Sequence, residues 1–120
     1  MCGRMTQTTD PAEVARIFDA ESTVESDADE AKPRYNVAPT QPLTVVLQRA
    51  EQGRLVEQHR WGLVPSFAKS LKDGAKRINA RAETVATSPS FRSSFRKRRC
   101  IVPSDGFYEW RRTGGPKQPY

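Results

Sequence analysis

Two apolar runs joined by a short turn constrain the fold of this chain more than any other feature of its sequence. Leu43 to Gln48 is rich in β-branched and apolar residues, and after the turn Glu51-Gln52-Gly53 a second, alternating run leads from Leu55 to Trp61. This arrangement predicts a β-hairpin. Gly62-Leu63-Val64-Pro65 then ends the second strand, because proline cannot donate to a strand ladder. An antiparallel sheet is therefore the expected framework.

Two short helices are expected beside this sheet. Asp10 is a good N-cap, Pro11 suits the first helical position, and Glu13 can close a capping box. Apolar residues then recur at helical spacing, at Val14, Ile17 and Phe18. A second helix is expected to open at Ser88-Pro89 and to place two aromatic side chains on one side, Phe91 and Phe95.

These elements predict one α+β domain over residues 1–120, with mostly antiparallel strands. Two cysteines, Cys2 and Cys100, and a single histidine, His59, argue against a disulfide framework and a zinc site. No segment reads as a signal peptide or a membrane span. We therefore expect a cytoplasmic monomer without a membrane partner, metal or other cofactor. His59 lies in a polar-alternating strand and is given no role.

The net charge of +6 is unevenly distributed along the chain. Residues 1–59 hold 6 Lys and Arg against 10 Asp and Glu, whereas residues 60–112 hold 13 Lys and Arg against 4 Asp and Glu. Such a basic stretch is typical of proteins that bind a polyanion, and the excess of 14 Arg over 6 Lys suits bidentate phosphate contacts. A merely solvated basic face is the alternative.

Cys2 directly follows Met1, and loss of the initiator methionine would make it the N-terminal residue. An N-terminal cysteine carries an α-amine with a pKa of about 7.7–8.0 beside a thiol with a pKa of about 8.5. With an aldehyde, the amine can form a Schiff base, and the thiol can then close a five-membered thiazolidine. The alternative is that its position beside the start codon is accidental.

Two further segments carry polar groups in patterns that suit chemistry. If Asn79-Ala80-Arg81-Ala82-Glu83-Thr84 is extended, its three polar residues other than threonine share one face; a surface strand with a salt bridge is the alternative. In Gly106-Phe107-Tyr108-Glu109-Trp110 a single carboxylate lies among three aromatic residues, where burial would raise its pKa and suit proton transfer. An edge-strand glutamate under aromatic packing is the alternative there. Trp61 and Phe67 offer rings on which bases can stack. The alternative is that at least one of these rings packs in the core.

Five ordered motifs across nearly the whole chain resemble the SOS-response-associated peptidase (SRAP) family of abasic-site processing proteins. They are Met1-Cys2-Gly3-Arg4, Tyr35-Asn36-Val37-Ala38-Pro39, Trp61-Gly62-Leu63-Val64-Pro65, Asn79-Ala80-Arg81-Ala82-Glu83-Thr84, and Arg99-Cys100-Ile101-Val102-Pro103 continued by Asp105-Gly106-Phe107-Tyr108-Glu109-Trp110. The resemblance implies a curved, barrel-like sheet flanked by short helices. It also implies a protein that binds single-stranded DNA and captures the aldehyde of an abasic site as a covalent thiazolidine crosslink.

The same resemblance implies roles for individual residues. Cys2 is the nucleophile, exposed by autoproteolytic or aminopeptidase removal of Met1; Asn79 holds the Cys2 amine or the sugar; and Glu109 moves protons. The implied DNA contacts are Arg4, Asn36, Trp61, Arg77 and Arg81. The implied partner is single-stranded DNA that contains abasic sites, and the protein would associate with the nucleoid when bound to it.

Two departures from the family pattern leave alternatives open. The family has a catalytic histidine in a His-x-Arg-Met-Pro motif well beyond the Phe-Tyr-Glu-Trp segment, and this chain ends at Tyr120 before such a motif. We therefore expect the N-terminal portion of a truncated domain. Phe67 also stands where many members carry tryptophan. The alternatives to the crosslinking protein are a thiol peptidase with Cys2 as N-terminal nucleophile, and an inactive fragment that only binds nucleic acid.

Overall fold

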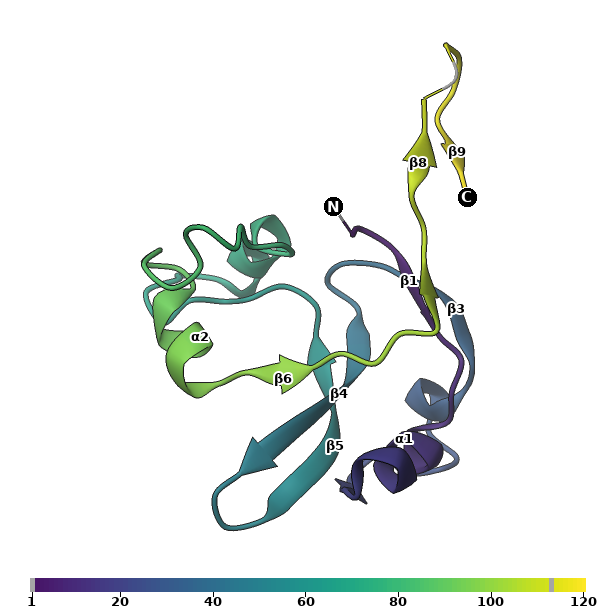
Figure 1. Ribbon diagram of the computed structural model, residues 1–120, viewed down its shortest axis with the longest axis vertical. Helices are drawn as coiled ribbons and strands as arrows, with labels where there is room; N and C mark the ends of the chain where they lie inside the picture. The colour runs from purple at the N-terminus through teal and green to yellow at the C-terminus, as the bar shows by residue number, and fades with distance from the viewer. Residues whose placement is uncertain (1, 113) are drawn as a thin grey trace.

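The structure is a computed structural model, and it describes residues 2–112 and 114–120. Figure 1 shows a central hairpin with helix α1 to its right, a loop-rich region to its upper left, and a C-terminal arm that projects upward from the rest. The helical elements are α1 (Pro11–Phe18), η1 (Asp29–Ala31), η2 (Leu71–Lys76) and α2 (Arg92–Lys97). The strands are β1 (Met5–Gln7), β2 (Glu21–Ser22), β3 (Arg34–Val37), β4 (Pro42–Arg49), β5 (Gly53–Arg60), β6 (Cys100–Ile101), β7 (Gly106–Phe107), β8 (Trp110–Arg111) and β9 (Gln118–Pro119).

The described strands form three sheets rather than one barrel-like sheet. Their orders are β3-β1-β7, β2-β5-β4-β6 and β8-β9, and every pairing is antiparallel except the parallel pair β2–β5. The expected α+β class with mostly antiparallel strands is therefore confirmed. Within residues 2–112 and 114–120 the sheets do not close on one another.

The predicted hairpin is confirmed as β4–β5, which pairs continuously from Pro42 opposite Arg60 to Arg49 opposite Gly53. Gly53 has a φ of 76°, a conformation that glycine adopts at little steric cost. Because side chains alternate across a strand, the two faces of β4 contribute to two different cores. Val45 packs on one face and Val46 on the other.

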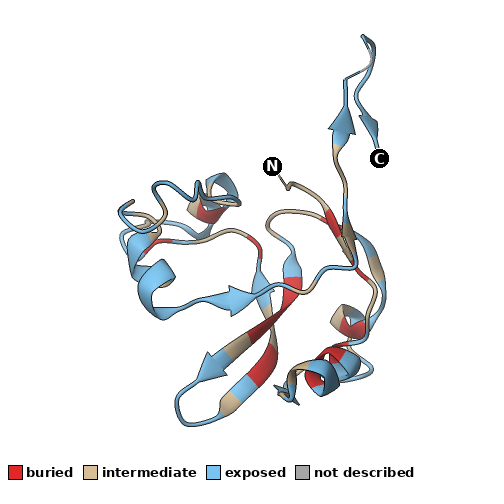
Figure 2. Ribbon diagram, in the orientation of Figure 1, coloured by how far each residue is buried: buried red, intermediate tan, exposed pale blue. Residues whose placement is uncertain are grey.

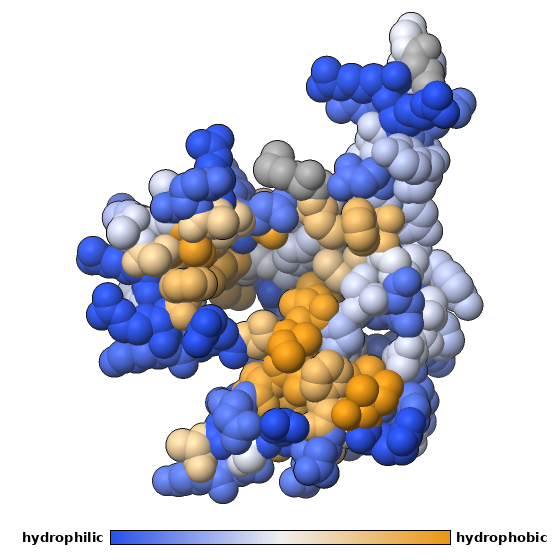
Figure 3. Space-filling view, in the orientation of Figure 1, coloured by the Kyte–Doolittle hydropathy of each residue, from blue (hydrophilic) through white to orange (hydrophobic). Residues whose placement is uncertain are grey.

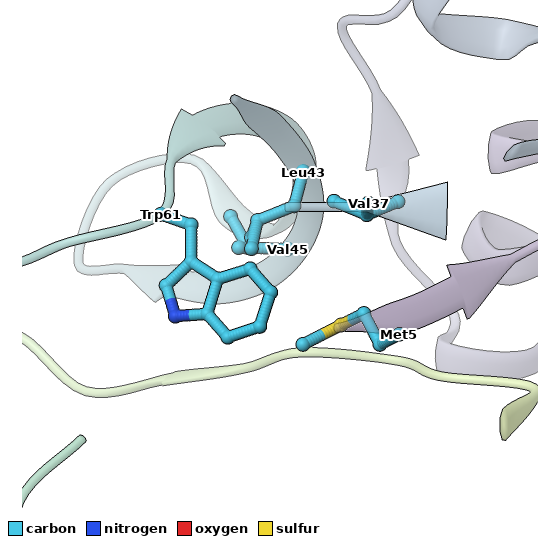
Figure 4. Close-up of a cluster of buried hydrophobic side chains, with 5 residues drawn as sticks. All are labelled: Met5, Val37, Leu43, Val45 and Trp61. Atoms are coloured by element: carbon cyan, nitrogen blue, oxygen red, sulfur yellow. The ribbon is translucent and has the colours of Figure 1, made fainter. Parts of the chain in front are cut away.

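The first core joins the hairpin to the N-terminal strand. It contains the buried side chains of Met5, Val37, Leu43, Val45 and Trp61, and Figure 4 shows the Met5 side chain extending toward the Trp61 indole. The second core packs α1 against the hairpin through Val14, Ala15, Val46 and Val56. Figure 2 shows that the buried residues concentrate in the hairpin, β1, β3 and α1.

Helix α1 begins as its sequence predicts but uses its glutamate differently. The Asp10 carboxylate accepts a hydrogen bond from the Ala12 amide at 2.7 Å, and Pro11 occupies the first turn. Glu13 does not close a capping box; it pairs with Arg16 at 2.6 Å one turn later. No helix in the described part of the chain is long and apolar enough to cross a membrane.

Residues 79–84 are not the extended segment that their alternation allowed. Residues 82–87 form consecutive turns, in which the Arg81 carbonyl accepts from the amides of Thr84 and Val85, and the Thr84 carbonyl accepts from that of Ser88. These local bonds replace a strand ladder, so the expected common face of Asn79, Arg81 and Glu83 does not form. The second helix also begins later than expected, at Arg92.

Candidate functional site

A hydrogen bond between two distant motifs defines the candidate site. The Asn79 side-chain amide donates to the backbone carbonyl of Cys2 at 2.9 Å, across 77 residues of sequence. Cys2 is half-buried and packs against the first core, with its thiol 3.8 Å from the Arg4 carbonyl oxygen. The structure thus places Asn79 beside Cys2 through the Cys2 carbonyl, whereas the role expected of Asn79 toward the Cys2 amine or the sugar stays a prediction.

The backbone just before Asn79 is held by two hydrogen bonds. The Trp61 indole N–H donates to the Ile78 carbonyl at 3.1 Å, and the Leu63 amide donates to the Arg77 carbonyl at 3.0 Å. These two bonds hold the peptide groups on both sides of Ile78. The segment that carries Asn79 is thus tied to the end of β5.

This tie requires two glycines in contact. Gly62 has a φ of 126°, and a Cβ at this position would lie 2.5 Å from the Gly74 carbonyl oxygen. A Cβ on Gly74 would meet the Gly62 carbonyl oxygen and the Val64 side chain, each at 2.9 Å. Only residues without a side chain allow the backbone at the end of β5 to approach that of η2 so closely.

Arg4, two residues after Cys2, lies beside Asn36. The Arg4 guanidinium donates to the Asn36 side-chain oxygen at 2.8 Å, which joins β3 to the N-terminal segment. The Arg4 carbonyl accepts from the Tyr108 amide at 2.9 Å, and the Tyr108 hydroxyl donates to the Tyr35 carbonyl at 2.8 Å. Sequence reasoning missed Tyr108 as the link, because its bonds depend on which strands become neighbours.

Glu109 follows Tyr108 and is half-buried at the base of the C-terminal arm. Its amide donates to the Tyr120 carbonyl at 3.1 Å, and its carbonyl accepts from the Tyr120 amide at 3.0 Å. The aromatic enclosure expected around it is incomplete: Phe107 is 62% exposed and Trp110 is 46% exposed. Both rings are therefore largely in solvent rather than packed together around the carboxylate as expected.

The remaining predicted DNA contacts occupy different environments. Arg81 is exposed, whereas Arg77 uses its guanidinium within the fold, donating to the Ser90 hydroxyl at 3.0 Å and the Asp73 carbonyl at 2.8 Å. Trp61 is only 8% exposed, so its ring packs in the core and offers no open face to a base. The stacking role expected of Trp61 is not what this structure shows. Phe67, in contrast, is 59% exposed.

The two cysteines differ in their environments. Partial burial raises the pKa of the Cys100 thiol above its ordinary value, although the residue as a whole is exposed. A raised pKa leaves less thiolate at neutral pH and so makes Cys100 a poor nucleophile. Among residues 2–112 and 114–120, no three His, Cys, Asp or Glu side chains gather in a way that could hold a metal ion.

Comparison with known proteins gives consistent matches over this chain. It is 42% identical over 112 residues to the abasic site processing protein YoqW of Bacillus subtilis (strain 168), covering 93% of this chain and 49% of that protein. It is 38% identical over 100 residues to the abasic site processing protein HMCES of Gallus gallus, covering 74% of this chain and 30% of that protein. The chain thus spans about half or less of the length of these relatives.

Solved structures show the same fold. A crystal structure of a protein from Bacteroides thetaiotaomicron superposes with a TM-score of 0.79 at 31% identity, covering 98% of this chain and 52% of that one. A phage-related protein from Bordetella bronchiseptica superposes with a TM-score of 0.71 at 28% identity. The sequence model of the family described as SOS response associated peptidase (SRAP) matches residues 1–120. Since this match spans the whole sequence, the chain belongs to the SOS response associated peptidase family.

Proposed function

We propose that this chain is the part of an abasic-site processing protein that captures the lesion through Cys2. The observation that carries the proposal is the 2.9 Å hydrogen bond from Asn79 to the Cys2 carbonyl, which holds a half-buried cysteine at the start of the chain in a fixed position. Relatives that share 38–42% identity carry the name abasic site processing protein. The basic residues 60–112 supply favourable charge for a DNA strand.

The proposed reaction needs Cys2 as the N-terminal residue after removal of Met1. The amine nitrogen attacks the aldehyde carbon of the opened abasic sugar, and the resulting carbinolamine loses one water to give an imine. The thiol sulfur then bonds to the imine carbon, and the nitrogen takes up the proton that the sulfur releases. One water is lost overall, with no oxidation or reduction.

Neighbouring residues supply position and proton transfer. Asn79 fixes the Cys2 backbone, so that the amine and thiol are presented together and less orientational freedom is lost in the reaction. Glu109 is the group we assign to proton transfer during loss of water and ring closure. Arg4, with Asn36 bonded to its guanidinium at 2.8 Å, and exposed Arg81 are the proposed phosphate and sugar contacts.

A thiol peptidase remains the second candidate because the family carries that description. A peptidase needs a base that takes the thiol proton and donors that stabilise an oxyanion. The contact that the structure gives the Cys2 thiol is with a backbone carbonyl oxygen, at 3.8 Å. A carbonyl oxygen orients a thiol but does not act as its base, so the aldehyde reaction is the better supported of the two.

Intact-mass spectrometry with single-stranded DNA carrying one abasic site tests the proposal. We expect a chain without Met1 to gain the mass of the DNA minus one water, and the adduct to survive without a reducing agent. Cys2→Ser keeps the amine but not the thiol, so it should give only an imine that requires borohydride for trapping. Cys100→Ser is the matched control and should react like the unmodified chain. An adduct that survives without borohydride in Cys2→Ser, or none with the unmodified chain after Met1 removal, would refute the proposal.

A further inference from the structure

Helix α2 and the residue that follows its C-cap carry an isolated group of cations. The group consists of Arg92, Arg96, Lys97, Arg98 and Arg99, and it is called the α2 cluster below. All five residues are exposed, and the sequence from 84 to 104 contains no aspartate or glutamate. Among the described residues, the side-chain ion pairs involve other cations: Arg16, Lys32, Arg49 and His59. The α2 cluster thus lacks the carboxylate partners found elsewhere on the surface.

The arrangement of these cations is unfavourable without an anion. Arg92 and Arg96 are four residues apart on a helix, and like charges at this spacing destabilise a helix. The helix dipole offsets part of this cost at Arg96 and Lys97, which lie in the last turn, but not at Arg92. A bound polyanion would remove the repulsion along the whole helix.

The shape of the surface favours a chain of phosphates. Arg92 and Arg96 line two adjoining depressions, one shared with Ser93 and Lys97 and the other with Ala86, Phe95 and Arg99. In the second depression the Arg99 guanidinium lies over the Phe95 ring, 5.6 Å from its centre, and Phe95 is 40% exposed. Figure 3 shows strongly hydrophilic residues over this part of the molecule.

The composition of the α2 cluster favours nucleic acid over an acidic protein. Four of its five cations are arginines, whose planar guanidinium matches phosphate oxygens in a bidentate fashion. An exposed aromatic ring beneath a guanidinium adds a flat surface on which an unpaired base can stack. An acidic protein surface would use the charge but would have no need of the ring.

We propose that the α2 cluster is a second nucleic-acid surface, separate from the Cys2 site, that binds the phosphodiester backbone of the DNA outside the lesion. Figure 1 places α2 beside β6 and away from the N-terminus. The inference rests on the proposed function in taking DNA as the partner. The phosphates could belong to the damaged strand or to a duplex next to it, and the test below separates the two.

The salt dependence of binding to undamaged DNA tests this surface without any reaction at Cys2. Arg92→Gln, Arg96→Gln and Arg99→Gln together should reduce the slope of log affinity against log salt by about 2, since each phosphate contact to a single strand contributes about 0.7. At low salt the affinity should fall by about tenfold or more. The measurement is made with a single-stranded oligonucleotide and with one in which a duplex adjoins the single strand. The oligonucleotide for which the variant loses more affinity identifies the source of the phosphates.

Two control variants separate a specific surface from net charge. Arg16→Gln, Lys32→Gln and Arg49→Gln together remove the same charge from cations that already have carboxylate partners, and should leave the slope nearly unchanged. Arg92→Lys, Arg96→Lys and Arg99→Lys together keep the charge and should keep the slope. Circular dichroism establishes that each variant is folded.

Several outcomes would overturn the inference. Equal slopes for the α2 glutamine variant and the unmodified chain would do so, as would equal losses in the α2 and paired-cation variants. Competition by polyglutamate as effective as that by DNA of the same charge would show a surface for acidic protein instead. The Cys2 adduct is scored separately. A smaller slope without any adduct would support the α2 surface and refute the proposed function, and an adduct with an unchanged slope would do the reverse.

Discussion

Cys2 and Glu109, the two residues to which the chemistry is assigned, are held by regions of very different packing. Cys2 lies against a core of five buried side chains and is bonded to Asn79. Glu109 lies where the chain leaves that core, and every residue from Trp110 to Arg112 and from Gly114 to Tyr120 is exposed. Figure 2 shows this contrast between the hairpin and the arm.

This contrast indicates that the contacts near Cys2 serve both the stability of the fold and the proposed reaction, whereas Glu109 lies outside the core. A change near Cys2 that disturbs Trp61 or the two facing glycines disturbs the fold as well, because the same contacts serve both. Glu109 lies outside that core, beside the exposed hairpin β8–β9, with its backbone bonded to that of Tyr120. Substitutions on the two sides should therefore give different combinations of stability loss and rate loss.

Glu109→Gln should give the largest effect on rate. The substitution keeps the size of the side chain but removes its ability to exchange a proton, and positioned acid–base groups contribute about 10²- to 10⁴-fold to rate. We expect the rate of adduct formation with abasic DNA to fall by a factor in that range under conditions where urea denaturation shows the variant to be folded. A rate within a factor of about two of the unmodified chain would show that Glu109 transfers no proton in the limiting step.

Gly62→Ala should lower both stability and rate. The new Cβ would lie 2.5 Å from the Gly74 carbonyl oxygen, at a φ of 126° that alanine rarely adopts. Overpacking and backbone strain together should cost about 2–5 kcal/mol of unfolding free energy. Gly114→Ala is the control: its φ is also positive, at 76°, but no atom lies within 4 Å of its Cβ position, so it should cost less. Equal losses in urea denaturation would contradict the role of the close approach.

Trp61→Phe tests whether the core also positions Asn79. Phenylalanine keeps an aromatic ring in the core but leaves the Ile78 carbonyl without the indole donor at 3.1 Å. An unpaired carbonyl costs about 1–3 kcal/mol, and the loss of ring volume adds to it. Because Ile78 precedes Asn79, we also expect slower adduct formation under conditions where the variant is fully folded. If the fully folded variant forms the adduct at an unchanged rate, Trp61 contributes only to packing of the core.

The parts of the fold that sequence reasoning predicted are those fixed by local rules. The β4–β5 hairpin follows from two apolar runs around a glycine turn, and the start of α1 follows from Asp10 and Pro11. Neither depends on distant residues. The α+β class then follows from the kinds of element present.

The parts that it missed depend on contacts between distant segments. An exposed stacking position and a core position for Trp61 are both consistent with its sequence, and only the assembled core decides between them. Extended and turned backbones are both open to the alanine-rich residues 79–84, and the turns form because local carbonyls accept their amides. A role for Asn79 toward the Cys2 amine or the sugar was expected from the family motifs, and the bond to the Cys2 carbonyl could not be predicted from the residues alone, since no periodicity links positions 77 residues apart.

Asp105→Asn should have the smallest effect. Asp105 lies at the junction between the core around Cys2 and the C-terminal segment that carries Glu109. The Asp105 carboxylate accepts from the Thr9 hydroxyl at 2.6 Å and from the amides of Thr8 and Thr9, and these bonds fasten the chain just before β7 to the end of β1. The same bonds, that from the Thr9 hydroxyl first, hold the pKa of Asp105 below its usual value of 3.8. Because the carboxylate is exposed, solvent screens it, and we expect a loss of at most about 1 kcal/mol at neutral pH.

The pH dependence of that loss identifies its origin. A carboxylate whose pKa is lower in the folded chain stabilises the fold above the unfolded pKa, and this contribution disappears as the pH falls through the folded pKa. The difference in unfolding free energy between the unmodified chain and Asp105→Asn should therefore be constant near neutral pH and shrink below about pH 4. Urea denaturation at several pH values measures it, with Asp27→Asn as an exposed control. A difference that stays constant into acid would mean that asparagine loses packing or geometry rather than charge. The junction would then hold the Glu109 side of the site to β1 by shape alone.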